Sequence, residues 1–331
     1  MRKALLIAFS VPALAQVLVN GAGATFPYPI YAKWFDEFHR LHPSALINYQ
    51  SVGSGAGIRQ LKAGVLDLGA SDMPLNDSDP ALSATGLLHF PTVIGGVAPV
   101  YNIPNLTREL NFTPQALAGI MLGKITRWDD PQLIEANRGA KLPDTEIFVV
   151  HRSDGSGTTY VLSEYLSKVS EEWRTTEGAG TSIRWKVGIG AKGNEGVAGL
   201  VKQAPFSFGY VELVYALQNQ IAYGRVRNAS GRFVKADLAG IRAAAAASAR
   251  SMPDDFRISI TDAPGKDAYP IASYTWLLTP ARIPDPVKKR IIVDLLHWMV
   301  LDGQRMAADL GYAPLPASVA SKVWKACDRI Q

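Results

Sequence analysis

The chain has 331 residues, a hydrophobic content of 47%, 29 glycines, 21 prolines and a formal net charge of +5. This length allows two domains, and this composition is typical of a folded, loop-rich α/β protein and excludes a disordered chain. The positive charge is small, and basic residues mostly alternate with acidic ones instead of forming a Lys/Arg block. The sequence therefore indicates no nucleic-acid partner.

The amino terminus has the features of a secretory leader. A basic start is followed by the apolar run 4–11, and Ala13 and Ala15 give the small-residue pattern for cleavage before Gln16. We therefore predict a signal peptide over residues 1–15, with a buried first strand as the alternative. The sole cysteine, Cys327, lies near the other end, so we expect a packed thiol, no lipid anchor and no intramolecular disulfide. Soluble export to a bacterial periplasm follows from these expectations.

The first third of the chain alternates short strands with amphipathic helices. Strands are predicted at residues 17–20, 46–50 and 66–71, with helices from about Pro29 and from Gly57. The apolar residues of these helices recur at helical spacing: Tyr31, Trp34, Phe35 and Phe38 in the first, and Ile58, Leu61 and Val65 in the second. Strands that alternate with helices predict a parallel sheet.

The rest of the chain carries clear helix-start signals. Thr113, Asp130 and Asp285 each precede a proline, which is the pattern of an N-cap followed by Pro at the first helical position. A strand predicted at 147–150 and a helix after Gly157 begin a second α/β unit. No repeat or low-complexity linker separates the two halves.

Three glycine-rich segments join a predicted strand to a predicted helix: residues 21–27, 53–57 and 153–159. Free backbone N–H groups and hydroxyls at a helix start, together with the helix dipole, favour a bound anion. Arg152 can add two parallel hydrogen bonds to the oxygens of an oxyanion. One such segment alone is typical of a capped α/β turn, whereas three with an arginine indicate a shared oxyanion site.

Asp72 directly follows the predicted strand 66–71, and ligands of open α/β sheets bind at the carboxyl ends of strands. A carboxylate there would accept a hydrogen bond from a P–OH group and would repel sulfate, which carries no proton at neutral pH. In the alternative interpretation, Asp72 only caps the turn before Pro74. The sequence leaves both interpretations open.

Enzymatic alternatives are weaker. Ser54 and Ser156 precede helices and five histidines are available as bases, but neither serine lies in the Gly-x-Ser-x-Gly pattern of a serine hydrolase. Residues 188–193 match the dinucleotide fingerprint, yet the strand candidate at 185–187 is short, which favours a glycine loop before a helix at 196–203. Metal-ligand spacing of Cys and His is lacking. We therefore expect a binding protein, with no catalytic residue, no metal site and no cofactor.

Six segments, in order, resemble the periplasmic phosphate-binding protein of the ABC phosphate importer, a PstS-type solute-binding protein: residues 21–27, 49–57, 69–72, 152–158, 193–196 and 311–316. The resemblance runs from about residue 18 to about residue 320. It implies a type II periplasmic binding protein fold of two α/β lobes, each a mainly parallel sheet flanked by helices, joined by a two-segment hinge. It also implies phosphate capture between the lobes and delivery to an inner-membrane permease with a cytoplasmic ATPase.

The resemblance implies eight phosphate ligands: Thr25, Phe26, Ser54 and Asp72 from the first lobe, and Arg152, Ser156, Gly157 and Thr158 from the second. Asp154 matches the family acid that pairs with the arginine. The implied first lobe covers residues 16–96 and 273–331, and the second covers residues 97–272, with crossovers near 97–101 and 270–275. The family often has another residue where His151 stands, which leaves these assignments unaffected.

We therefore expect a monomeric phosphate receptor without catalysis. Two rival interpretations stay open at this point. A secreted phosphate-ester hydrolase on the same scaffold would need a nucleophile or a metal. A binding module for another oxyanion or for an acidic surface polymer would lack one-to-one binding of phosphate.

Overall fold

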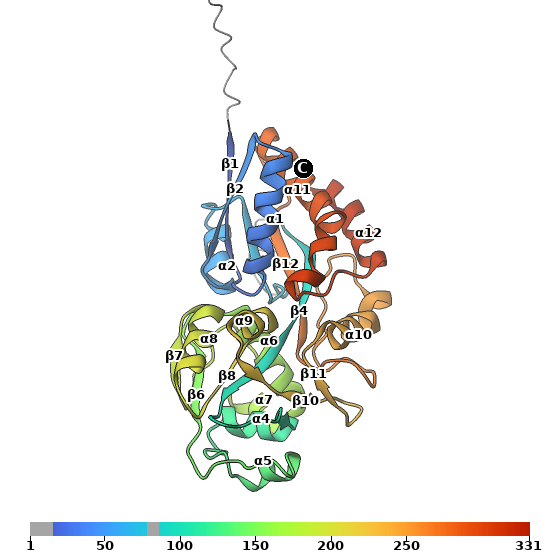
Figure 1. Ribbon diagram of the computed structural model, residues 1–331. Coiled ribbons are helices and arrows are strands. Elements are labelled where there is room, and N and C mark those ends of the chain that lie inside the picture. Colours follow the sequence, from blue (N-terminus) through green and yellow to red (C-terminus); the bar gives the residue numbers. More distant parts are fainter. Residues whose placement is uncertain (1–15, 78–85) are drawn as a thin grey trace, which may run out of the picture.

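The computed structural model describes residues 16–77 and 86–331, so the predicted signal peptide over residues 1–15 lies outside the described residues. The protein is a mixed α/β structure of two lobes, one above the other in Figure 1, with strand β4 passing between them. Its main sheet has the strand order β2-β1-β3-β12-β4-β8-β6-β7, and β9 pairs with β4 off this path. The expected two-lobed α/β fold is confirmed.

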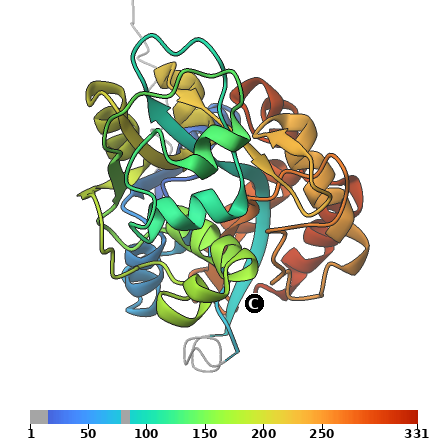
Figure 2. The same ribbon diagram turned by 90° about the horizontal axis from the view of Figure 1, so that it is seen from below.

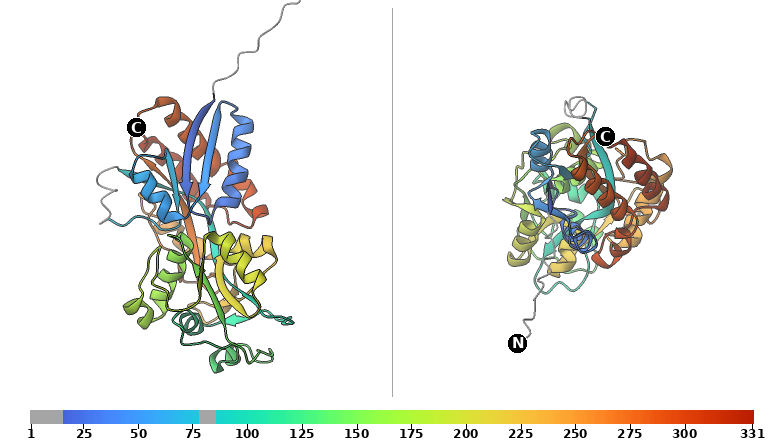
Figure 3. Two further views of the ribbon diagram at one scale, coloured as in Figure 1. Left: turned by 90° about the vertical axis from the view of Figure 1, so that its left-hand side faces the viewer. Right: turned by 90° about the horizontal axis from the view of Figure 1, so that it is seen from above.

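The first lobe begins with three parallel strands, β1 (Val17–Gly23), β2 (Ala45–Ser51) and β3 (Leu68–Ser71), with β1 between the other two. Helices α1 (Tyr28–Leu41) and α2 (Ser54–Lys62) connect them, beside the strands in the left view of Figure 3. The predicted apolar face of α1 is buried: Tyr31, Trp34, Phe35 and Phe38. The strand–helix alternation and the parallel pairing predicted here are therefore confirmed.

Two long strands connect the halves of the main sheet. β12 (Ala272–Pro280) pairs antiparallel with β3 and with residues 87–96 of β4 (Leu87–Asn102). From Val97 onward β4 pairs instead with β8 (Ser207–Glu212), again antiparallel. The central pairings therefore depart from the parallel arrangement, and β4 changes partner within the predicted crossover region.

The second lobe has its own parallel strands. β6 (Phe148–Arg152) pairs in parallel with both β7 (Ile189–Ala191) and β8. Its helices are α4 (Pro114–Met121), α5 (Pro131–Ala136), α6 (Gly157–Val169), α7 (Glu171–Thr176), α8 (Gly193–Gln203) and α9 (Leu213–Asn219). Strand β9 (Ala222–Tyr223) follows α9. A small separate sheet contains β5 (Asn111–Phe112), β10 (Arg225–Arg227) and β11 (Phe233–Lys235).

The remaining helices are α10 (Leu238–Ser248), α11 (Pro286–Val300) and α12 (Ala317–Ala326). Short 3-10 turns occupy Ala249–Ser251, Gly303–Met306, Ala308–Leu310 and Cys327–Arg329. Helices α11 and α12, coloured red, lie along one side of the molecule in Figures 1 and 2. None of the helices within residues 16–77 and 86–331 is long and apolar enough to cross a membrane.

The predicted helix starts are confirmed by their caps. Thr113 accepts a hydrogen bond from the N–H of Ala116 at 3.0 Å, which begins α4. Asp130 and Asp285 accept from the backbone N–H two residues ahead, at 2.9 and 2.8 Å, which begins α5 and α11. Each cap satisfies a backbone donor that the first turn of the helix leaves free.

Two of the glycine segments differ from the prediction. Gly21 and Gly23 lie within β1, and α2 begins at Ser54, so Gly57 lies inside that helix. A side chain at Gly57 would place its Cβ 2.4 Å from the Cα of Gly23, so the glycines allow α2 to pack closely on β1. Residues 185–187 form no strand, in agreement with the glycine-loop interpretation, although the helix that follows, α8, begins at Gly193 and not at Gly196.

The sole cysteine packs in the core, as predicted. Cys327 is 1% exposed, and its thiol lies 3.4 Å from the carbonyl oxygen of Val323, as a weak donor. Burial raises the pKa of this thiol to about 12, which keeps it protonated and unreactive at neutral pH.

Candidate anion-binding site

The turn after β1 has two neighbouring backbone carbonyls that are held by tyrosine hydroxyls. The Tyr49 hydroxyl donates to the carbonyl of Ala24 at 2.9 Å, and the Tyr215 hydroxyl donates to the carbonyl of Thr25 at 2.6 Å. In a trans peptide the N–H points opposite to the C=O. The N–H groups of Thr25 and Phe26 therefore point away from the tyrosines that hold these two carbonyls. Two neighbouring backbone donors are fixed in this way.

Asp72 presents a free acceptor at the end of β3. One carboxylate oxygen, Oδ1, accepts from the hydroxyl of Thr275 on β12 at 2.6 Å. The other, Oδ2, is buried and has no hydrogen-bond partner among the described residues. Burial raises the pKa of Asp72 to about 7, and the Thr275 hydrogen bond and the Arg152 charge offset only part of this rise. An unpaired buried carboxylate oxygen is costly and is suited to a ligand that brings a proton.

Ser54 lies against Asp72 at the start of α2. Its hydroxyl oxygen accepts from the backbone N–H of Asp72 at 3.3 Å, and its side chain is fully buried. Gly157, the first residue of α6, closes the other side of this group. A Cβ at Gly157 would lie 2.3 Å from both Asp72 Oδ2 and Ser54 Oγ. The unpaired carboxylate oxygen therefore lies beside the N-terminus of α6, where the helix dipole favours negative charge.

Arg152, the last residue of β6, is held in a forked pair. Its Nε and Nη2 donate to the two carboxylate oxygens of Asp154 at 2.8 and 2.5 Å, and its side chain is 1% exposed. Its Nη1 donates to the hydroxyl of Thr158 at 3.3 Å. Although burial alone would raise the pKa of Asp154, the hydrogen bonds and charge of Arg152 outweigh it and lower that pKa. The acid therefore stays ionised and offsets part of the arginine charge.

Ser156 caps helix α6 and directs the helix start toward the first lobe. Its hydroxyl oxygen accepts from the N–H of Thr159 at 3.0 Å. Both hydroxyl oxygens proposed as hydrolase nucleophiles, those of Ser54 and Ser156, thus accept from backbone N–H groups. His151 instead stacks on Trp185, with ring centroids 4.9 Å apart, and burial lowers its pKa. These contacts give the serine hydrolase interpretation no support.

The two halves of the site are in direct contact. The N–H of Gly55 in α2 donates to the carbonyl of Gly155 at 2.9 Å, and the side-chain amide of Asn194 donates to Thr25 Oγ1 at 2.7 Å. The structure therefore brings the predicted residues together from the ends of β1, β3 and β6 and from the starts of α2 and α6. Seven of the eight predicted ligands have side chains and all seven are at most 3% exposed: Thr25, Phe26, Ser54, Asp72, Arg152, Ser156 and Thr158. Their role as ligands stays a prediction.

Sequence reasoning missed three buried residues at this site. Asn194 contacts Thr25 and Thr158, and Thr275 contacts Asp72. Glu212 accepts from the N–H of Val214 through Oε2 at 2.7 Å, its Oε1 has no partner among the described residues, and burial raises its pKa well above the usual value. Asn194 lies in the segment 193–196 of the resemblance, which was the available signal for it. Thr275 and Glu212 carried no comparable signal.

A groove of about 630 Å³ opens in front of the Thr25 turn. It is lined by residues of both lobes: Tyr28, Pro29, Tyr49, Gln50, Ser51, Glu195, Tyr215 and Gln218. Tyr49 and Tyr215 are the residues that hold the carbonyls of that turn. The groove therefore lies next to the buried polar cluster, on the side of its two tyrosines.

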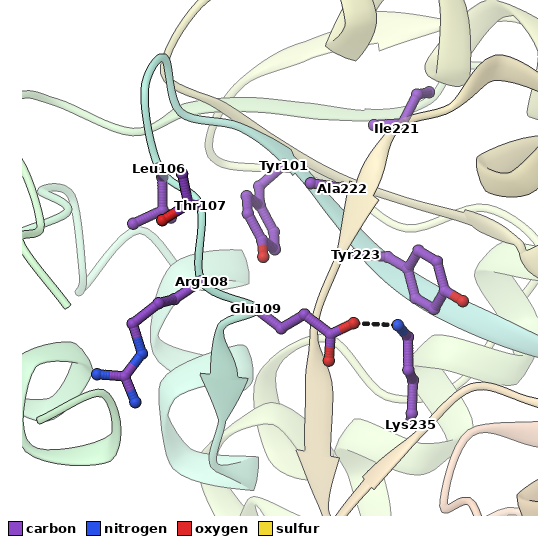
Figure 4. Close-up of a pocket in the computed structure, with 9 residues that line it drawn as sticks. All are labelled: Tyr101, Leu106, Thr107, Arg108, Glu109, Ile221, Ala222, Tyr223 and Lys235. Atoms are coloured by element: carbon purple, nitrogen blue, oxygen red, sulfur yellow. Dashed lines mark hydrogen bonds and ion pairs between the residues drawn. The ribbon is translucent and has the colours of Figure 1, made fainter. Parts of the chain in front are cut away.

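A second hollow, of about 150 Å³, lies elsewhere on the second lobe and is shown in Figure 4. Lys235 forms an ion pair with Glu109, drawn as a dashed line, and lies 4.6 Å above the ring centre of Tyr223. Both charged side chains are partly exposed, and such surface ion pairs contribute little to the stability of the fold. None of the predicted ligands lines this hollow.

Chemically, the predicted ligands combine N–H and O–H donors, one partly neutralised arginine and one unpaired carboxylate oxygen, that of Asp72; Glu212 beside them has a second unpaired oxygen among the described residues. Within residues 16–77 and 86–331, no group of three or more His, Cys, Asp or Glu side chains is placed to hold a metal ion. Such a cluster can surround an oxyanion and accept a hydrogen bond from a protonated oxygen of that ion. It suits binding.

Comparison with known proteins first defines the class. The fold and the model of the PBP superfamily domain, which matches residues 10–300, place the chain among the two-lobed periplasmic binding proteins. Two solved structures show the same fold. A phosphate-binding protein from Stenotrophomonas maltophilia is 18% identical with a TM-score of 0.74, covering 93% of each chain. The periplasmic phosphate-binding protein PfluDING, solved with phosphate, is 22% identical with a TM-score of 0.73, covering 94% of each chain.

Curated relatives then give the family. The phosphate-binding protein PstS of Xylella fastidiosa (strain Temecula1 / ATCC 700964) is 45% identical over 93% of this chain and 84% of its own length. The PstS of Pasteurella multocida (strain Pm70) is 42% identical over 96% of this chain and 92% of its own length. The chain therefore belongs to the PstS family of phosphate-binding proteins. These relatives are named as binding proteins, not as enzymes.

Proposed function

We propose that this protein captures inorganic phosphate between its two lobes and delivers it to an ABC-type phosphate import permease. The observation that carries the proposal is the free Oδ2 of Asp72, buried beside Ser54 Oγ and the start of α6. A buried acceptor among donors fits an oxyanion that still carries a proton, as phosphate does at neutral pH. The names of the relatives, phosphate-binding protein PstS, support the same ligand.

The proposed ligands divide by chemistry. Thr25 and Phe26 supply backbone N–H groups, and hydroxyls come from Thr25, Ser54, Ser156 and Thr158. Gly157 supplies a backbone N–H at the start of α6, and Arg152 supplies the positive charge. Asp72 is the single acceptor among the proposed ligands, and Asp154 holds the arginine without touching the ion. Because the cluster is buried, each phosphate oxygen must find its donors within the protein.

The proposed lobes are residues 16–96 with 273–331, and residues 97–272. The change of partner along β4, from β12 up to Gly96 to β8 from Val97, supports this boundary. The second connection runs near the start of β12, at Ala272. Rotation of the lobes about these two segments would open the cluster to water and close it on the ion.

The transport setting is part of the proposal. Export by a signal peptide over residues 1–15 would place a monomer, without lipid anchor, in the periplasm. There it would pass phosphate to inner-membrane permease subunits whose cytoplasmic ATPase drives import. The names of the relatives imply a phosphate transporter as partner, and the periplasmic protein PfluDING, which has the same fold, is consistent with the location.

Equilibrium dialysis of the phosphate-stripped protein against phosphate tests the proposal. We expect saturation at one phosphate per chain. A chromogenic phosphate ester, incubated with the protein with and without chelator, should release no product. Absence of saturable phosphate binding would contradict the proposal, and chelator-resistant turnover of the ester would replace it with the hydrolase interpretation.

A further inference from the structure

Asn194 connects three segments that are far apart in the sequence. It is the second residue of α8 and is fully buried. Its Nδ2 donates to Thr25 Oγ1 at 2.7 Å and to Thr158 Oγ1 at 3.0 Å. Its Oδ1 accepts from the backbone N–H of Glu212 at 3.0 Å. One side chain therefore joins the first-lobe turn, the start of α6 and the end of β8; α6, α8 and β8 lie together in the lower lobe of Figure 1.

The orientation of this amide follows from its third partner. A backbone N–H can only donate, so the amide oxygen must face Glu212 and the NH₂ group must face the two threonines. Glu212 is paired with Val97, at the point where β4 changes from one half of the sheet to the other. The amide is therefore held by the same backbone that forms the crossover between the lobes.

The amide in turn determines what the Thr25 hydroxyl can do. A hydroxyl has two acceptor lone pairs and one proton. Thr25 Oγ1 accepts from Asn194 Nδ2 at 2.7 Å and from the Asn194 backbone N–H at 3.3 Å. Both lone pairs are then occupied, and the proton is left to donate to an anion held between the lobes.

The Thr158 hydroxyl is constrained in the same way. Its oxygen accepts from Asn194 Nδ2 at 3.0 Å and from Arg152 Nη1 at 3.3 Å. Its proton has a long contact of 3.4 Å to Asn194 Oδ1, which a closer anion oxygen would outcompete. Both threonines thus present O–H donors to the ion.

We propose that Asn194 is a positioning residue that fixes the hydroxyls of Thr25 and Thr158 as donors toward the bound anion and ties the two lobes together around it. The inference rests on the proposed phosphate site. Asn194 thus adds to the selectivity that Asp72 provides. Asp72 supplies the one acceptor among the proposed ligands, and Asn194 prevents two hydroxyls from becoming acceptors. Together, Asp72 and Asn194 select an ion that has many hydrogen-bond acceptors and carries one proton.

The decisive variant is Asn194→Asp, which keeps the shape and replaces the NH₂ donor by an acceptor. The two hydroxyls would then donate to the introduced carboxylate, and the ion would lose both donors and meet a negative charge. We expect phosphate affinity near pH 8 to fall by at least about a hundredfold. The ratio of parent to variant affinity should narrow as the pH is lowered to about 5, because a neutral carboxyl group regains an O–H donor.

Two further variants make the test specific. Asn219→Asp adds the same charge at the end of α9, where the amide donates to the carbonyl of Tyr215, and it should change affinity by less than about threefold. Asn194→Ala removes the donors without adding charge, so affinity should fall about tenfold at every pH. Thermal unfolding of each phosphate-free variant shows whether it is folded.

The outcomes separate this inference from the proposed function. Failure of the parent protein to bind phosphate would overturn the proposed function. If the parent binds phosphate and Asn194→Ala binds equally well, the positioning role is wrong. It is also wrong if the Asn194→Asp loss is constant with pH, because that result is what a purely structural contribution of the side chain would give.

Discussion

Two aspartates, one in each lobe, follow the carboxyl ends of parallel strands and have opposite ionisation behaviour. Asp72, after β3, is buried, its Oδ2 has no partner in the part of the chain that the structure describes, and its pKa is raised to about 7. Asp154, after β6, is partly buried but paired through both oxygens with Arg152, and its pKa is lowered. Burial raises the pKa of both carboxyl groups, so the difference between their pKa values comes from the hydrogen-bond partner, which is Thr275 for Asp72 and Arg152 for Asp154.

The difference shows how a site can hold an anion and still contain an acid. On the second-lobe side, the arginine charge is already shared with Asp154, so the ion is held by hydrogen bonds as much as by net charge. On the first-lobe side, Asp72 keeps one oxygen free for a proton on the ligand. A site with a bare arginine and no free acceptor would accept sulfate as readily as phosphate.

The largest expected effect is on stability, in two separate pH windows. For the phosphate-free protein, the free energy of unfolding should fall by several kcal/mol as the pH rises from about 4 to about 7, because the raised pKa of Asp72 favours its neutral form in the folded state. Glu212 acts in the same direction. Asp154, with its lowered pKa, stabilises the fold above its unfolded pKa and loses this contribution as the pH falls below about 4.

Denaturant titrations from pH 3 to 8 would measure both windows. Asp72→Asn should reduce the slope of the upper window to the part that Glu212 contributes and should leave the lower window, whereas Asp154→Asn should reduce the lower window and leave the upper one. An Asp72→Asn profile that parallels the parent between pH 4 and 7 would show that Asp72 is not the source of the upper window.

The next effect comes from removing the arginine. Arg152→Ala should weaken phosphate binding by about 2–4 kcal/mol, because the buried ion loses its one positively charged donor and Asp154 is left unpaired beside it. Arg174→Ala, which removes an exposed arginine of the same lobe paired with Glu171, is the control and should change binding little. Calorimetric titration measures both. A loss below about 1 kcal/mol for Arg152→Ala would mean that the hydrogen bonds of the turns alone hold the ion.

The acceptor at Asp72 should govern discrimination. Asp72→Asn can donate as well as accept, so the free-energy gap between phosphate and sulfate binding should shrink by about 2 kcal/mol. Asp36→Asn, an exposed change of the same kind on α1, should leave the gap unchanged. Parallel calorimetric titrations with phosphate and with sulfate measure this difference in binding free energy. Discrimination as sharp as in the parent would contradict recognition of the proton by Asp72.

The smallest expected effect is steric. Gly157→Ala would place a methyl group 2.3 Å from Asp72 Oδ2, so the lobes could not close fully, and phosphate affinity should fall by about 1–2 kcal/mol. Gly199→Ala, in α8 where an added Cβ would meet no neighbouring element within 4 Å, should leave affinity unchanged and stabilise the helix. Equal affinity for the parent and Gly157→Ala would mean that the ion is bound without this close approach.

The sequence predicted the parts of this site that depend on local pattern. Strand, capped turn and helix follow one another directly along the chain, so β6, Ser156 and α6 could be recognised, and with them Arg152. The helix caps at Thr113, Asp130 and Asp285 were equally local. The signal peptide and the lobe boundaries stay predictions.

The parts that were missed depend on distant contacts. Asn194 meets Thr25 across 169 positions, and Thr275 meets Asp72 across 203. No periodicity specifies which residue of α8 or β12 faces a given turn. The antiparallel pairing of β12 was missed for the same reason, and Gly57 was taken for a turn because its role, the close approach of α2 to β1, is visible only in three dimensions.

The central claim is that this protein selects a protonated oxyanion. Calorimetric titration of the phosphate-stripped parent with phosphate, and then with sulfate at the same pH, tests it most directly. We predict one tight phosphate site and no heat of binding with sulfate. Equal binding of the two ions would keep the anion site and contradict the role given to the free oxygen of Asp72.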